Sequence, residues 1–206
     1  MIDFTALVTI GTTFFVVTAS PGPGNLAGAT VAMTNGRRIG LTFAAGLASG
    51  LTFWGLLAAL GMGAILQSSA NALFALKLVG GGYLLWLALQ SGRSAVRRGP
   101  QVALDVASGR WYIRGLILNL SNPKAVLAWL AAFSVGLDTA NGMGTLIAAM
   151  GLCITIVILN ATFWAMLFSS KGMMAVYERS RRWVDGVVAG MFAVAGFGML
   201  RSAFAR

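Results

Sequence analysis

Six long apolar stretches, joined by short segments that carry most of the charge, constrain this chain more than any other feature. Each stretch is near or above the ~20 residues that an α-helix needs to cross ~30 Å of hydrocarbon. Only 10% of the residues are charged, against roughly 25% in soluble domains, which argues against a water-exposed surface. The sequence therefore predicts an all-α membrane protein in a lipid bilayer, with six transmembrane helices at residues 4–33, 39–66, 72–89, 115–137, 143–168 and 186–204.

The distribution of lysine and arginine predicts the orientation of these helices. Eleven of the fifteen lie in the connecting segments 34–38, 90–114 and 169–185. By the positive-inside rule these segments face the cytoplasm, which puts both termini on the outer, periplasmic side of a bacterial inner membrane. The first stretch has no positively charged leader, so we expect an uncleaved helix rather than a signal peptide. The rule also accounts for the net charge of +10, and we expect no nucleic-acid partner.

Reactive side chains are scarce. The chain has no histidine, and its one cysteine, Cys153, lies within an apolar stretch, so no intramolecular disulfide and no cysteine–histidine metal site can form. We find no carboxylate pair, serine–histidine arrangement or phosphate-binding glycine loop, and we expect no enzyme, no metal and no cofactor. No aspartate or glutamate falls within the six stretches, which would leave a cationic substrate without a counter-charge.

Prolines interrupt the first and the fourth stretch, at residues 20–25 and 119–124. A proline inside a helix removes a hydrogen bond, and in hydrocarbon the freed groups must find partners in protein or in a wet cavity. Each interrupted helix opens one half of a single domain over residues 1–206: a first repeat at about 1–90, a cytoplasmic loop at about 91–112, and a second repeat at about 113–206. The alternation of sides makes the two three-helix repeats inverted, and paired interruptions in inverted repeats indicate a transporter's binding site. The alternative is that both are proline kinks that only shape packing.

The residues at the interruptions are therefore the candidate substrate-binding residues. Free amides there can hold a carboxylate, and free carbonyls can hold an ammonium, as an amino acid requires. The candidates are Pro21, Gly22, Pro23, Asn25, Asn119, Asn122, Pro123 and Lys124. Lys124 would bind a carboxylate or cap the carbonyls that Pro123 frees, unless it snorkels to the membrane surface.

Secondary candidates are Lys77, Tyr83 and Asn160. Lys77 lies near the outer end of its helix, where snorkelling is the simpler explanation. Asn160 would line a cavity or form an interhelical hydrogen bond. Small residues at Gly46-x-x-x-Gly50, Gly186-x-x-x-Gly190 and Gly80-Gly81-Gly82 allow close helix contact, and pairing through such stripes would permit a homodimer.

Several motifs, in order and at consistent spacing, resemble the LysE/RhtB family of lysine and homoserine–threonine exporters over essentially the whole chain. The matching pieces are Pro21-Gly22-Pro23, Gly36-Arg37-x-x-Gly40, Gly46 with Gly50, Leu76-Lys77-x-x-Gly80-x-x-Tyr83-Leu84-Leu85, and Gly115-x-x-x-Asn119-x-x-Asn122-Pro123-Lys124. The resemblance implies a bacterial inner-membrane exporter of amino acids or close derivatives, often described as proton-driven, and draws attention to Lys77. The chain departs from the family pattern at Gly24, where Asp or Asn is common, and at Trp54, where His is common.

We therefore expect a secondary transporter that exports a small, neutral amino acid or derivative by alternating access, with coupling to protons as an option. One alternative is a non-transporting membrane scaffold, which predicts that the interruptions tolerate substitution. Another is a passive channel for small solutes, which would leak without saturating. A membrane redox carrier would need a cysteine beside each interruption, and none is there.

Overall fold

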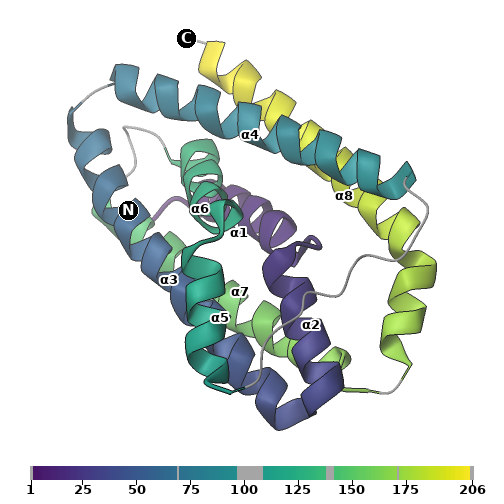
Figure 1. The fold of residues 1–206 in the computed structure, drawn as a ribbon. Helices are drawn as coiled ribbons and strands as arrows, with labels where there is room; N and C mark the ends of the chain where they lie inside the picture. The colour runs from purple at the N-terminus through teal and green to yellow at the C-terminus, as the bar shows by residue number, and fades with distance from the viewer. Residues whose placement is uncertain (1, 69, 97–108, 138–141, 171, 205–206) are drawn as a thin grey trace.

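The computed structural model describes residues 2–68, 70–96, 109–137, 142–170 and 172–204, and these residues contain helices and no strands (Figure 1). The all-α prediction is confirmed. The helices are α1 (Phe4–Ala19), α2 (Pro23–Asn35), α3 (Arg37–Ser68), α4 (Ala70–Val96), α5 (Trp111–Leu120), α6 (Pro123–Gly136), α7 (Met143–Leu167) and α8 (Met173–Phe204).

Both predicted interruptions are sharp bends between two helices. The axes of α1 and α2 differ by 55°, and those of α5 and α6 by 59°. Pro23 and Pro123 stand at the start of α2 and α6, respectively, rather than inside a helix. The first helical position suits proline, because its missing N–H would have no intrahelical acceptor there. The two breaks are thus built alike, each with proline opening the second helix.

Glycines set how closely the helices approach one another. A methyl group at Gly46 of α3 would lie 2.0 Å from the carbonyl oxygen of Tyr112, and one at Gly115 of α5 would lie 2.2 Å from that of Phe43. The predicted close contact at Gly46 and Gly50 is therefore made between α3 and α5. Gly80 and Gly81 likewise bring α4 against α8, and these two helices run antiparallel along one side of the molecule (Figure 1).

The close contact predicted at Gly186 and Gly190 is not made within the described residues. A methyl group at Gly186 or Gly190 would meet nothing within 4 Å in the described structure. The homodimer that such stripes would permit stays a prediction.

The main core lies where α1, α4, α6 and α7 meet, around Phe14, Trp129 and Phe133. All three side chains are fully buried. The indole nitrogen of Trp129 donates to the carbonyl of Leu51 at 2.7 Å, so its polar atom is satisfied inside the apolar core. This core holds α6 firmly beside α1, which brings the two breaks to the same level.

Three described helices are long and apolar enough to cross a membrane, namely α3, α7 and α8, and the number is five if each bent pair is one span. The third predicted stretch lies in α4, which is not among these candidates. The structure thus supports a helical membrane protein, and the count of six spans stays a prediction.

The last helix begins earlier than the sequence predicts. We expected it at residues 186–204, after a cytoplasmic segment, but α8 starts at Met173 and its candidate span starts at Ala175. The expectation that no carboxylate enters a span is therefore wrong: Asp185 lies inside it and is only 4% exposed. Arg181 accounts for this, because its Nε lies 3.3 Å from a carboxylate oxygen of Asp185 one turn away, and its guanidinium also donates to Ser94 of α4.

Candidate functional site

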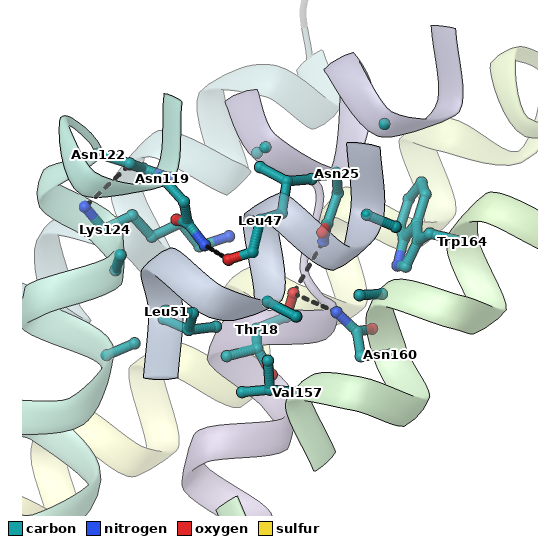
Figure 2. Close-up of a pocket in the computed structure, with 18 of the residues that line it drawn as sticks. Thr18, Asn25, Leu47, Leu51, Asn119, Asn122, Lys124, Val157, Asn160 and Trp164 are labelled. Atoms are coloured by element: carbon teal, nitrogen blue, oxygen red, sulfur yellow. Dashed lines mark hydrogen bonds between the residues drawn. The ribbon is translucent and has the colours of Figure 1, made fainter. Parts of the chain in front are cut away.

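A small cavity, partly open to the outside, lies between the two breaks (Figure 2). Six helices contribute to its wall, through Val17, Thr18, Gly22, Gly24, Asn25, Gly28, Ala44, Leu47, Ala48, Leu51, Asn119, Asn122, Lys124, Ala125, Ala128, Val157, Asn160, Ala161, Trp164 and Ala165.

The first break presents backbone carbonyls. Where α1 ends, the carbonyl of Thr18 accepts hydrogen bonds from the side-chain amides of Asn25 and Asn160, at 2.8 and 3.2 Å (Figure 2). The carbonyl of Ser20 accepts a second bond from Asn25, at 3.1 Å. Carbonyls at the end of a helix have no intrahelical donor, so side chains from α2 and α7 satisfy them. The α2 N-terminus beside them begins at Gly22, which offers no side-chain cap.

The second break presents side-chain donors. Asn122 caps α6 by accepting a hydrogen bond from the backbone nitrogen of Lys124 at 3.1 Å. Asn119, in the last turn of α5, is 7% exposed and donates to the carbonyl of Leu47 in α3 at 2.5 Å (Figure 2). Trp54 donates to the carbonyl of Leu120 at 3.2 Å. The end of α5 is therefore tied to α3 by polar as well as close-packed contacts.

Lys124 joins the two breaks. Its ammonium nitrogen lies 2.9 Å from the carbonyl oxygen and 2.6 Å from the hydroxyl oxygen of Ser20. A methyl group at Gly22 would lie 3.0 Å from the same nitrogen, so the absence of a side chain lets the lysine approach the backbone. Among the residues that line the cavity, Lys124 alone carries a charge. The cavity therefore offers one cation and several amides, and the Thr18 carbonyl, bonded to Asn25 and Asn160, lies in its wall.

Most of the predicted site residues come together here. Gly22, Asn25, Asn119, Asn122, Lys124 and the secondary candidate Asn160 all line the cavity, whereas the three prolines shape the bends without lining it. Tyr83 lies elsewhere, buried in α4 and stacked on Trp86 with ring centres 5.6 Å apart. The side chain of Lys77 lies outside the described part of the structure.

Sequence reasoning missed Thr18 and Trp164. Thr18 takes part through its carbonyl, which every residue has, so no side-chain signal marks it. Trp164 had no signal of its own, because aromatic residues are common in apolar helices. A helical-face pattern could have found it, since residues 157, 160, 161, 164 and 165 share one face of α7.

Residues 15–203 match the sequence profile described as LysE type translocator. The chain belongs to this family. The resemblance that the sequence motifs indicated is confirmed, and with it an amino-acid efflux family of transporters rather than enzymes.

The threonine efflux protein of Escherichia coli (strain K12) is 32% identical over 203 residues, which cover 93% of this chain and 95% of that protein. The homoserine/homoserine lactone efflux protein of Salmonella typhimurium is 32% identical over 119 residues, covering 57% of this chain and 58% of that protein. An uncharacterized membrane protein of Pseudomonas aeruginosa is 28% identical over 205 residues, covering 96% and 93%. No solved structure matches the chain.

Proposed function

We propose that this chain exports a small, neutral amino acid or derivative across the bacterial inner membrane, and that the substrate binds in the cavity between the two breaks. Family membership supports the class of activity, and two of the relatives are named for efflux of threonine and of homoserine. The remainder of the proposal depends on the chemistry of the cavity.

The observation that carries the proposal is the contact between Lys124 and Ser20. A zwitterionic amino acid needs a cation for its carboxylate and acceptors for its ammonium, and this contact places the two side by side. In our proposal the substrate carboxylate pairs with Lys124, and its ammonium displaces side-chain donors from the carbonyls of Thr18 and Ser20, each of which accepts two hydrogen bonds here. The uncapped N-terminus of α2 adds backbone amides and a favourable dipole for the carboxylate.

The proposal includes alternating access, which depends on the arrangement of the halves. In the proposed inverted repeat, α1 and α2 correspond to α5 and α6, α3 to α7, and α4 to α8. The matching bends of 55° and 59° support this correspondence. The packing of the two halves differs in two ways. First, α5 packs on α3 more extensively than α1 packs on α7. Second, α4 packs on α6, whereas the corresponding helices α8 and α2 make no comparable contact in the described structure. If each half took up the packing that the other half has in this structure, the cavity would open to the other side of the membrane.

The proposal also includes the sidedness inferred from the basic segments, with both termini periplasmic and six spans. A reporter fused to the C-terminus and active only in the cytoplasm would contradict that arrangement. Coupling to protons is proposed through Lys124, since it is the titratable lysine of the cavity wall.

The test is efflux from proteoliposomes preloaded with labelled threonine, homoserine, leucine or lysine, with and without a pH gradient. We expect saturable efflux of the small neutral substrates, accelerated by the gradient and lost in Lys124→Ala. The control variant, Arg38→Ala, removes an exposed cation away from the cavity and should transport normally. Efflux that rises linearly with concentration would indicate a channel, and no efflux from folded protein would favour the scaffold.

A further inference from the structure

One wall of the cavity is a single face of α7. Val157, Asn160, Ala161, Trp164 and Ala165 line the cavity, and their spacing of three and four residues places them on one stripe of the helix. Asn160 anchors the middle of this stripe by its hydrogen bond to the Thr18 carbonyl. Trp164 follows four residues later, about one helical turn or ~5.4 Å along the axis. In Figure 2 Trp164 and Lys124 lie at opposite sides of the cavity.

Two aromatic side chains that do not line the cavity hold the indole of Trp164 in place. It stacks on Phe168 of the same face, with ring centres 5.1 Å apart and planes only 7° from parallel. Tyr177 of α8 meets the Trp164 ring edge-on, at 6.1 Å and 73°. Such offset and edge contacts restrict both the position and the tilt of a ring. Trp164 is therefore a preformed wall of the cavity.

The polar atom of this wall is the indole nitrogen of Trp164. Within the described part of the chain, the indole nitrogen of Trp164 makes no hydrogen bond, whereas those of Trp54 and Trp129 each donate to a backbone carbonyl. Figure 2 draws the nitrogen at the end of the Trp164 ring that is nearer to Asn160. An indole can only donate, so its natural partner is an oxygen acceptor on a bound molecule.

We propose that Trp164, together with Ala161 and Ala165, forms the side-chain subsite of the transporter and selects a short, uncharged side chain that carries a hydroxyl. This inference rests on the proposed function, which puts the substrate's charged groups at Lys124 and at the Thr18 and Ser20 carbonyls. Trp164 stands one helical turn from Asn160, which is bonded to the Thr18 carbonyl, and a side chain of two or three heavy atoms spans such a turn. The hydroxyl accepts the indole N–H, and the small side chains of the two alanines leave room for the rest of the short side chain.

Charge in the cavity wall agrees with this selection. Lys124 is the one charged residue among those that line it, and it is engaged at the other side. A lysine or glutamate side chain in the subsite would be desolvated without a counter-charge, which is costly. An apolar side chain of equal size would fit but would leave the indole N–H without an acceptor.

Threonine and valine test this directly, because they differ only by a hydroxyl in place of a methyl group. We would measure initial efflux rates of each from proteoliposomes, for the wild type, Trp164→Phe and Trp86→Phe. The first variant keeps an aromatic wall and removes the N–H, and the second changes an exposed tryptophan that does not line the cavity. The wild type and Trp86→Phe should prefer threonine by about tenfold, as one hydrogen bond allows, and Trp164→Phe should show a ratio near one.

A second variant covers the case in which Trp164→Phe folds poorly. Ala161→Val narrows the subsite by two methyl groups, and it should lower the ratio of threonine to serine efflux by about tenfold. An unchanged threonine-to-valine ratio in Trp164→Phe, or an unchanged threonine-to-serine ratio in Ala161→Val, would overturn the subsite. Absence of saturable wild-type efflux of any amino acid would instead overturn the proposed function on which it rests.

Discussion

The two breaks share their bend and their proline, yet they offer opposite chemistry. The first, at residues 20–22, exposes carbonyls that collect donors from Asn25, Asn160 and Lys124. The second, at residues 121–122, is closed by its own Asn122 cap and sends the Lys124 side chain across to the first. One break therefore supplies acceptors and the other supplies a cation. A zwitterion needs both, so neither half alone makes the proposed site.

The helices that lead into the breaks are also held differently. Leading to the second break, α5 lies on α3 through direct backbone contact at Gly46 and Gly115. Leading to the first, α1 meets α7 at Gly11, where a methyl group would lie 2.9 Å from the end of the flexible Leu152 side chain. The difference indicates that α5 is clamped to α3 in this state, whereas the contact of α1 with α7 has room to adjust.

The largest expected effect comes from breaking the clamp. Gly46→Ala puts a methyl group 2.0 Å from a carbonyl oxygen that belongs to another helix, so α3 and α5 must separate. Overpacking of a rigid contact costs about 1–3 kcal/mol, and occasionally more when the obstacle is backbone. We expect little folded protein by size-exclusion chromatography. Gly11→Ala is the matched control. It should remain folded with a Tm close to that of the wild type, because the Leu152 side chain can rotate away. An equal loss of folded protein in both variants would contradict the difference between the two helix contacts.

A smaller effect is expected at the acceptors of the first break. Asn25→Ala removes a donor from both Thr18 and Ser20, whereas Asn160→Ala removes one donor from Thr18 alone. Each carbonyl keeps at least one other donor in either variant, so the cost is that of the lost hydrogen bonds, about 0.5–1.5 kcal/mol each. Asn25→Ala should therefore lower the Tm more than Asn160→Ala, measured by thermal unfolding in detergent, and should slow efflux about tenfold. The reverse order would show that the carbonyls of the first break do not depend on Asn25.

The smallest effect is expected at the cap of the second break. Asn122→Ala removes the acceptor for the Lys124 backbone nitrogen, and the loss of such a cap costs about 1 kcal/mol. Asn122→Ser retains a capping oxygen and should recover most of the Tm. If serine is no better than alanine in the same unfolding assay, Asn122 contributes through something other than the cap.

Much of this fold follows from local sequence signals. Proline with glycine at residues 21–24 and asparagine with proline at 122–123 locate both bends, and the apolar stretches locate α3 and α7 to within two residues at each end. The start of α8 was missed because Arg181 and Asp185 look solvent-exposed until Ser94 of another helix is placed beside them. A tertiary contact decides that boundary, and a single stretch of sequence does not contain it.

The candidate site divides in the same way. Lys124 and Asn25 stand out because a cation or an amide beside a break at membrane depth needs a partner. Their partners on the first break are carbonyls, which are identical in every residue and become distinctive only where α1 ends. Tyr83 was a candidate through the family motif alone, and the fold places it among core residues of α4.

The central claim is that the two breaks form one substrate site, and a double-mutant cycle tests it most directly. The cycle measures kcat/KM for threonine efflux in the wild type, Ser20→Ala, Lys124→Met and the double variant. We predict that Ser20→Ala has a smaller effect in the Lys124→Met background than in the wild type, with a coupling of about 1 kcal/mol or more, because both substitutions remove the bond between the Lys124 ammonium and the Ser20 hydroxyl. Effects that simply multiply would mean that Ser20 and Lys124 act independently, and would contradict a shared site.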